Sequence, residues 1–327
     1  MISPIYLHQN IGVITAGRSR QWQGFVFPLL LVFGIWGCAA SDRLYNVSSD
    51  PVPLPLYHEG TTYIYSDGNT ETVQSVTPEQ VVWRNHRGHF SSGSPDFTYR
   101  RTKWESRTRS GTRAFRARND WLGDPSSPSI WPLQTGKTAR HIEMGQWRDA
   151  EGSVHSYQTQ WRVEVSGKER VRVKAGSFDT WKIVARRFSK GSASDQSRVR
   201  EIRTWHYAPE AGHYVKVAYH YPGGRPDRSI ELVAILPPPV LSNAGPQHRV
   251  QSNFQQALEN NPSGVPLPWY LAEKALSGTT TPTATFRLKS GTYCRQYIQT
   301  VTRRGKNHVF YGLACRTDDG EWKIPRR

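Results

Sequence analysis

The stretch that decides the fold runs from Glu169 to Arg187 and reads ERVRVKAGSFDTWKIVARR. Valines alternate with charged residues as far as Val173, the pattern breaks at Ala175-Gly176-Ser177, and Trp181 begins a second alternating run. A repeat of two residues is the period of a β-strand, and glycine beside small residues is typical of a tight turn. The stretch therefore predicts an antiparallel hairpin.

The same arrangement recurs along the middle of the chain. Thr204–Tyr221, TWHYAPEAGHYVKVAYHY, places a turn at Pro209–Gly212 between two alternating segments, and Tyr63-Ile64-Tyr65 runs into an Asp-Gly turn. No apolar repeat of helical period and comparable quality occurs between Tyr57 and Leu236. We therefore expect a mainly β fold, in which a large antiparallel sheet is curved, or closes into a partly open barrel, to bury one face.

These two hairpins resemble an uncharacterised family of periplasmic β-sheet proteins. The resemblance rests on Val173, Ala175, Gly176, Phe178, Trp205, Tyr207 and Pro209. It implies a fold and no activity, because the function of that family is unknown. Related curved sheets in envelope lipoprotein carriers hold acyl chains in an apolar hollow, which supplies an alternative function. We expect instead that the tryptophan and tyrosine side chains fill the core.

A proline-rich boundary separates this region from a C-terminal part of different character. Three consecutive prolines follow Leu236 and favour a stiff, extended linker over 237–249. The next segment, VQSNFQQALENN from Val250, carries its apolar residues on one helical face and stops before Pro262. We expect a small α+β module over 250–327.

Two of the three cysteines lie in this C-terminal part. In a hairpin centred on Arg304-Gly305, Cys294 and Cys315 are equally far from the turn and stand directly opposite each other. Opposed positions on antiparallel strands approach closely enough for a disulfide, which an oxidising periplasm would keep. A zinc site is the weaker interpretation, because two isolated cysteines lack a nearby histidine pair.

The tail resembles the C-terminal region of the rickettsial seventeen-kilodalton surface antigen family of outer-membrane lipoproteins. The resemblance rests on Cys294-Arg295, Ala314-Cys315-Arg316 and Asp319-Gly320-Glu321-Trp322-Lys323-Ile324. It implies an envelope location and a small disulfide-bearing β module, with no known catalytic residue. The glycine-zipper segment that those antigens carry upstream is absent from this sequence, so a membrane-inserting role does not carry over.

The N-terminal segment has the layout of a signal peptide. Arg18 and Arg20 precede an apolar run, Gly24–Gly37, which is interrupted by Pro28. A membrane-spanning helix needs about 20 apolar residues, and this run is shorter. We therefore expect a cleaved leader, with an uncut anchor helix as the alternative.

The end of this run resembles the bacterial lipobox. Ile35-Trp36-Gly37-Cys38 has the aliphatic residue, the glycine and the cysteine of that motif, whereas Trp36 is bulkier than usual. The resemblance implies that Cys38 becomes the first mature residue, receives a diacylglyceryl thioether and carries acyl chains such as palmitate. By resemblance to enterobacterial sorting, Ala39 in place of aspartate implies the outer membrane, facing the periplasm.

A chain of 327 residues is long enough for two domains. The expected organisation is a lipoprotein signal peptide over 1–37, a tether over 38–56, a β-rich periplasmic domain over 57–236, a proline-rich linker over 237–249 and a surface-antigen-like domain over 250–327.

The formal net charge of +17 predicts anionic surroundings. Arginines alternate with aromatic residues between Arg84 and Arg118, a mixture that stacks on nucleobases in other settings, but an exported protein rarely meets nucleic acid. We expect contacts with the membrane through the lipid anchor and with lipopolysaccharide, anionic lipid, peptidoglycan or other envelope proteins. The residues expected to face the anionic surface are Arg100, Arg101, Lys103, Arg107, Arg109, Arg113, Arg116 and Arg118.

No familiar catalytic pattern occurs in the sequence, neither a Gly-x-Ser-x-Gly elbow nor a phosphate-binding glycine loop nor a zinc motif. His206, His213 and His220 are evenly spaced. However, a turn separates His206 from the other two, and the odd spacing puts His213 and His220 on opposite faces of one strand. We therefore expect structural histidines. The sequence thus predicts no catalytic residue, metal or cofactor. We expect a non-catalytic structural or binding component of the cell envelope. A carrier or sensor of a lipid-like ligand is the first alternative, and a glycan or peptidoglycan hydrolase is the second.

Overall fold

The computed structural model describes residues 51–99, 101, 103–108, 111–121, 129–149, 151–188, 198–238 and 244–325. These residues belong to one compact unit. Within those ranges no helix has the length and apolar character needed to cross a membrane.

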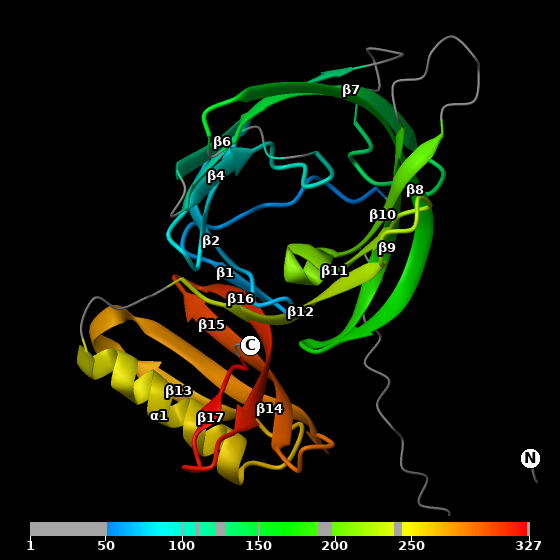
Figure 1. Ribbon diagram of the computed structural model, residues 1–327. Coiled ribbons are helices and arrows are strands. Elements are labelled where there is room, and N and C mark those ends of the chain that lie inside the picture. The colour runs from blue at the N-terminus through cyan, green and yellow to red at the C-terminus, as the bar shows by residue number, and fades with distance from the viewer. Residues whose placement is uncertain are drawn as a thin grey trace, which may run out of the picture. The chain divides into compact units, whose positions relative to one another are not determined.

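The first part of the described chain is a ring of antiparallel strands, β1 to β12, which we call the strand ring (Figure 1). The strands are β1 (Thr62–Tyr65), β2 (Thr70–Val76), β3 (Val81–Asn85), β4 (Phe90–Gly93), β5 (Lys103–Thr108), β6 (Gly111–Trp121), β7 (Thr138–Arg148), β8 (Val154–Val173), β9 (Gly176–Phe188), β10 (Val199–Ala208), β11 (His213–His220) and β12 (Arg228–Leu236).

Each strand of the ring pairs with its neighbour in sequence, and β1 pairs with both β2 and β12, so the pairings return to their start. The link between β4 and β5 is the thinnest, because it holds only Ser91↔Trp104 and Ser92↔Lys103. The prediction of a mainly β, curved antiparallel sheet is confirmed.

The hairpins predicted from the sequence are present. Strands β8 and β9 pair from Val173↔Gly176 outward. Strands β10 and β11 are joined by the 3-10 turn Pro209–Ala211, which Gly212 ends at a φ of 65°. That left-handed conformation suits glycine, because a side chain there would crowd the backbone.

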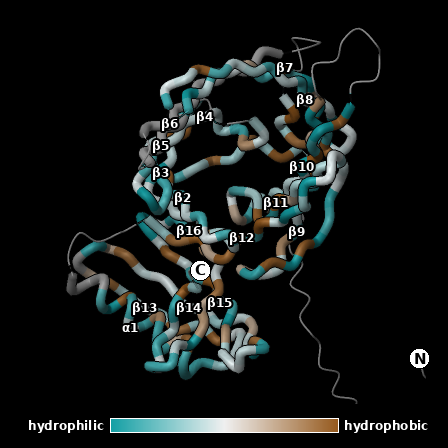
Figure 2. Tube along the Cα trace, in the orientation of Figure 1, coloured by the Kyte–Doolittle hydropathy of each residue, from teal (hydrophilic) through white to brown (hydrophobic). Residues whose placement is uncertain are grey.

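Large apolar side chains fill the middle of the strand ring. Trp181, Phe178 and Ile183 on β9 are at most 2% exposed, and Trp205 and Tyr207 on β10 are both 3% exposed. Figure 2 shows apolar positions gathered where β9 to β12 lie. The expectation that aromatic residues fill the core is therefore confirmed for the described residues.

Two glycines in the sheets are covered by a tyrosine on the neighbouring strand. Gly145 on β7 is the register partner of Tyr157 on β8, and Gly312 is the partner of Tyr297 in the C-terminal part. A Cβ built on Gly145 would lie 2.5 Å from the Tyr157 hydroxyl, and one on Gly312 would lie 2.4 Å from that of Tyr297. The two tyrosine side chains therefore require glycine at the positions they cover, as in other sheets where an aromatic residue shields a strand glycine.

The C-terminal part is a five-stranded antiparallel sheet with one helix, and we call it the C-terminal module. Its elements are α1 (Ala244–Asn260), β13 (Leu267–Leu271), the 3-10 turn Ala272–Lys274, β14 (Leu276–Arg287), β15 (Tyr293–Arg303), β16 (Lys306–Arg316) and β17 (Trp322–Lys323). The apolar face of the predicted helix is confirmed, since Phe254, Ala257 and Leu258 are buried.

The predicted extended linker is wrong over its last six residues. Residues 244–249 form the first turns of α1 instead of continuing the stiff segment. Pro246 is the third residue of that helix, where the backbone amide needs no intrahelical partner, so proline is compatible with helix there.

The predicted disulfide is confirmed. Cys294 and Cys315 are register partners on β15 and β16 and are bonded to each other. The bridge packs against Ile64 and Val233 of the strand ring. A pairing of Ala234 on β12 with Gly312 on β16 joins the two parts at the same place.

The fold begins earlier than the predicted end of the tether. Val52 is 2% exposed and forms a two-way backbone bridge with Leu133. Leu54 packs against the core of the strand ring. Val52 and Leu54 reach the core and Pro55 is buried, whereas Leu56 is exposed, so the fold begins at Val52. Cys38 and the rest of residues 1–50 lie outside the described residues.

Candidate functional site

The two Cys-Arg pairs in the tail hold helix α1 on the sheet of the C-terminal module. Arg295 is buried and donates from Nη1 to the Leu258 carbonyl at 2.6 Å and from Nη2 to the Asn261 carbonyl at 2.8 Å. Carbonyls at a helix C-terminus have no intrahelical partner and carry partial negative charge. Arg295 therefore caps α1 from the neighbouring strand.

Arg316 and Trp322 bind the same helix at Glu259. Arg316 donates from Nε and Nη2 to the two carboxylate oxygens of Glu259, both at 3.0 Å, and Trp322 Nε1 donates to Oε2 at 2.8 Å. The bond from Trp322, followed by that from Arg316, lowers the pKa of Glu259. Arg295, Arg316 and Trp322 of the tail motif thus hold the helix on the sheet.

The predicted basic surface is only partly within the described residues. Lys103 is exposed at the start of β5. Arg100 and Arg109 lie outside the described residues, and the side chains of four further predicted residues on β5 and β6 do as well, namely Arg107, Arg113, Arg116 and Arg118.

The prediction that Arg101 faces an anionic surface is wrong, because its guanidinium is already paired within the fold. Its guanidinium binds Glu71 Oε2 at 2.5 Å and Ser91 Oγ at 2.6 Å, and it lies 5.0 Å from the Trp83 ring centroid. A side chain that neutralises a carboxylate among aromatic rings is unavailable to a surface ligand. The alternation of charges along the sequence did not reveal this, because the partner carboxylate, Glu71, is 30 residues away in the sequence.

The three evenly spaced histidines have separate partners. His206 binds Glu169, His220 binds Asp227 at 2.8 Å, and the ring of His213 accepts or donates a bond with the Tyr57 hydroxyl at 2.9 Å. In the part of the chain that the structure describes, no group of three or more potential metal ligands gathers. Each of the three histidines thus has a protein partner of its own.

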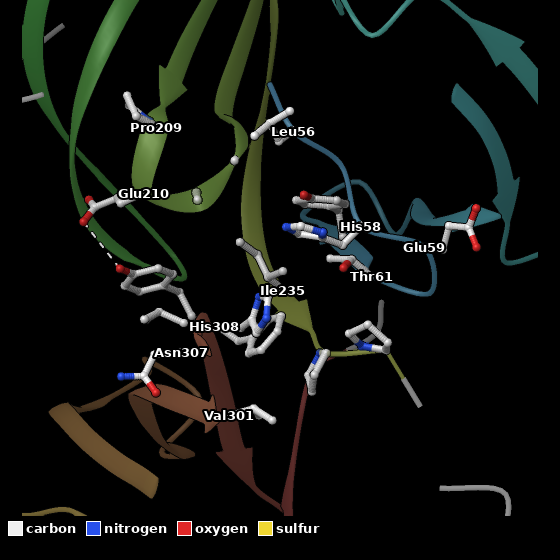
Figure 3. A pocket seen from close by; sticks show the side chains of 18 of the residues that line it. Leu56, His58, Glu59, Thr61, Pro209, Glu210, Ile235, Val301, Asn307 and His308 are labelled. Atoms are coloured by element: carbon white, nitrogen blue, oxygen red, sulfur yellow. Dashed lines mark hydrogen bonds between the residues drawn. The ribbon is translucent and has the colours of Figure 1, made fainter. Parts of the chain in front are cut away.

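A cavity of about 980 Å³ lies between the strand ring and the β15–β16 hairpin, and we call it the junction cavity (Figure 3). Its apolar wall includes Leu56, Ile235 and Val301, and its polar groups include His58 and His308. Leu56 is 79% exposed and Val309 40% exposed, so apolar surface is open to the cavity. Pockets that bury small amphipathic ligands have this size and this mixture of lining groups.

The ionisable groups of the junction cavity are spread around it. Glu210 Oε2 accepts a bond from the Tyr311 hydroxyl at 3.4 Å, and loss of hydration raises the pKa of Glu210. Loss of hydration and then the neighbouring His308 ring lower the pKa of His58. Figure 3 shows Glu59 and Glu210 on opposite sides, with their carboxylates pointing away from each other. The pair does not have the facing arrangement that glycoside hydrolysis uses.

The C-terminal module is similar in sequence to known proteins. Residues 256–323 match the family model described as 17 kDa outer membrane surface antigen. Over 70 residues, 21% of this chain, the sequence is 44% identical to the 17 kDa surface antigen of Rickettsia prowazekii (strain Madrid E) and 43% identical to that of Rickettsia bellii (strain RML369-C). The matched region spans 44% of each relative's length. The resemblance predicted for the tail is confirmed.

Solved structures show weak similarity to the rest of the chain. The hypothetical lipoprotein YmcC from Escherichia coli (K12) aligns with a TM-score of 0.34 and 9% identity, covering 53% of this chain and 81% of that one. A putative exported protein with YmcC-like fold from Bacteroides fragilis NCTC 9343 aligns with a TM-score of 0.31 and 12% identity, covering 57% of this chain and 100% of that one. The predicted relation of the middle region to a periplasmic family stays a prediction.

Proposed function

We propose that this protein is a lipid-anchored component of the bacterial cell envelope that binds anionic envelope molecules without converting them. The observation that carries the proposal is the match of residues 256–323 to the outer membrane surface antigen model, at 44% identity to a rickettsial antigen. Within that match, Arg295 and Arg316 bind helix α1, and Cys294 and Cys315 form a disulfide. A disulfide supports an oxidising compartment outside the cytosol.

The proposed anchor is Cys38, at the end of the lipobox-like sequence Ile35–Cys38. Each buried CH₂ of an acyl chain contributes about 0.8 kcal/mol, so two or more chains hold a protein stably on a bilayer. Ala39, rather than aspartate, supports the outer membrane and a periplasm-facing orientation. The net charge of +17 supports anionic lipid, lipopolysaccharide or peptidoglycan as the neighbouring surface.

Metabolic labelling with a palmitate analogue tests this proposal directly. Wild-type protein should incorporate the label and sediment with outer membranes, and Cys38→Ser should lose the label. Cys294→Ser is the matched control, because it also removes one thiol yet leaves the lipobox intact. Label retained in Cys38→Ser, or wild-type protein recovered from the cytosol, would contradict the proposal.

A second candidate function, the binding of a lipid-like ligand, is favoured by the junction cavity. The open apolar surface of Leu56 and Val309 suits an acyl chain, and His58 and Arg303 at the same cavity suit an anionic headgroup. Binding of a fluorescent fatty acid should be saturable in the wild type and weaker in Leu56→Asp. Leu288→Asp is the control, since Leu288 is 44% exposed and lies outside the cavity. Equal binding by both variants would remove this candidate.

A further inference from the structure

An arginine–tyrosine–arginine row crosses the inner face of the strand ring. Tyr219 on β11 is the register partner of Arg203 on β10 and of Arg228 on β12. The guanidinium carbon of Arg203 lies 5.1 Å from the Tyr219 ring centroid, and that of Arg228 lies 4.4 Å from it. Trp205 and Ile230, two residues along the same strands, belong to the core, so the row borders the filled interior.

The row carries unbalanced positive charge. Glu201 is shared, since Arg203 binds its Oε1 at 2.6 Å and Arg187 binds its Oε2 at 3.1 Å. Burial alone would raise the pKa of Glu201, but Arg203 and then Arg187 lower it, which keeps the carboxylate ionised. Arg228 is exposed and has no ion pair among the described residues. Arg187, Arg203 and Arg228 thus bring three guanidinium groups to the row, and Glu201 binds two of them.

A pocket of about 360 Å³ opens beside this row, and we call it the arginine pocket. Besides the row it is lined by Trp205, Phe97 and Tyr214 and by the carboxylate of Asp67. Counted with Glu201 and Asp67, the three guanidinium groups at the row exceed the carboxylates by one. The Arg101–Glu71 pair also borders it, so the charge of Arg101 is already balanced there. The volume lies at the lower end of the range for small-molecule sites, which suits one or two sugar rings.

One buried polar atom at the arginine pocket has no partner in the protein. His213 lines the pocket and is 2% exposed, and its Nδ1 is engaged by the Tyr57 hydroxyl. Its Nε2 makes no hydrogen bond among the described residues. Buried polar groups are seldom left without a partner, so such an atom beside a pocket indicates a place for a ligand or water.

We propose that the arginine pocket binds an anionic sugar, with its phosphate or carboxylate held by Arg203 and Arg228. Guanidinium groups give charge-assisted hydrogen bonds to both kinds of anion. The rings of Trp205, Phe97 and Tyr214 offer apolar faces against which a sugar ring packs. An uncharged apolar ligand would leave the guanidinium groups desolvated without compensation. The inference rests on the proposed function, because anionic sugars are the envelope molecules of this chemistry.

Fluorescence titration of the mature protein, purified from membranes in detergent micelles, tests this inference. Trp161 and Trp205 report on the pocket, because the Arg203 guanidinium carbon lies 5.0 Å and 5.4 Å from their ring centroids. The probes are glucosamine 1-phosphate, N-acetylmuramic acid, neutral N-acetylglucosamine and inorganic phosphate. At least one anionic sugar should saturate the signal and bind more tightly than the neutral sugar and than phosphate alone. Preference for the phosphate identifies a lipid headgroup sugar as the source, and preference for the carboxylate identifies a cell-wall sugar.

The matched variants are Arg228→Gln and Arg225→Gln. Arg228→Gln should weaken binding about tenfold or more, because it removes one charge-assisted bond. Arg225→Gln makes the same charge change on an exposed residue outside the pocket and should leave the affinity unchanged. Both arginines are exposed, so thermal melting should match the wild type in each variant.

Failure of every anionic probe, equal binding of the neutral sugar or of phosphate, or equal weakening by both variants would overturn the inference. A protein that incorporates palmitate at Cys38 yet binds no anionic sugar refutes the pocket and leaves the proposed anchoring intact. A protein that binds the sugar without incorporating the label refutes the anchoring alone.

Discussion

Breaking the Cys294–Cys315 disulfide should destabilise the fold by a calculable amount. The two cysteines are 21 residues apart and close the β15–β16 hairpin. Cys294 is fully buried and packs with Leu313 and with Val233 of the strand ring. The bridge therefore restricts the unfolded chain while its sulfur atoms contribute to the contact between the two parts.

The chain-entropy model gives the magnitude. Closing a loop of this length removes unfolded-state entropy equivalent to about 3 kcal/mol at 25 °C. Reduction of the wild type should therefore lower the free energy of unfolding by about 3 kcal/mol. The double variant Cys294→Ala/Cys315→Ala should show the same loss both with and without reductant. Removal of the buried sulfur atoms should cost it about 1 kcal/mol more.

Urea denaturation with and without reductant measures both effects. The oxidised wild type should unfold at clearly higher urea than the reduced wild type, and the double variant should be insensitive to reductant. Single variants at either cysteine should be about as unstable as the double variant, because each breaks the same bond. A difference below about 1 kcal/mol between oxidised and reduced wild type would refute the reasoning, since it would mean that the bridge constrains little of the unfolded chain.

Three further changes test the packing. Arg295→Gln removes the cap of α1 and should cost about 3 kcal/mol in urea denaturation, whereas the exposed Arg303→Gln on the same strand should cost less than about 0.5; equal losses would count against the capping role. Gly312→Ala puts a Cβ 2.4 Å from the Tyr297 hydroxyl. The free energy of unfolding should fall by about 1–3 kcal/mol, and the thermal midpoint should fall with it. An unchanged midpoint would show that the sheet relaxes freely. Burial lowers the pKa of His141 to about 4, so its neutral form stabilises the fold above pH 6.5, and that stability is lost as the pH falls through 4. The loss should reach about 3 kcal/mol and be absent in His141→Phe; parallel pH profiles of the two proteins would contradict this assignment.

Local signals in the sequence were sufficient for most of the architecture. Alternation around Ala175-Gly176 and around Pro209–Gly212 predicted both hairpins, because period two and turn residues are properties of adjacent positions. Equal distances from Arg304-Gly305 predicted the register of Cys294 and Cys315, which the structure has. The helix was predicted with its apolar face, but its start was placed too late because the prolines before it were interpreted as extended chain.

Contacts between distant segments were beyond such signals. Arg101 belongs by sequence to a basic run, but its partner Glu71 lies 30 residues away on another strand. The arginine pocket was missed for the same reason, since Arg203, Tyr219 and Arg228 come together only through the registers of β10, β11 and β12. The spacing Glu201-x-Arg203-x-Trp205, which puts a carboxylate, a guanidinium and an indole on one face of a strand, was the available clue.

The central claim is that Cys38 anchors this protein to the envelope, and mass spectrometry of the mature N-terminus tests it most directly. Trypsin should release the peptide Cys38–Arg43, CAASDR, from membrane-extracted protein, with the added mass of a diacylglyceryl group on the sulfur and an acyl chain on the α-amino group. A peptide that still joins Gly37 to Cys38 and carries a free thiol would contradict the claim.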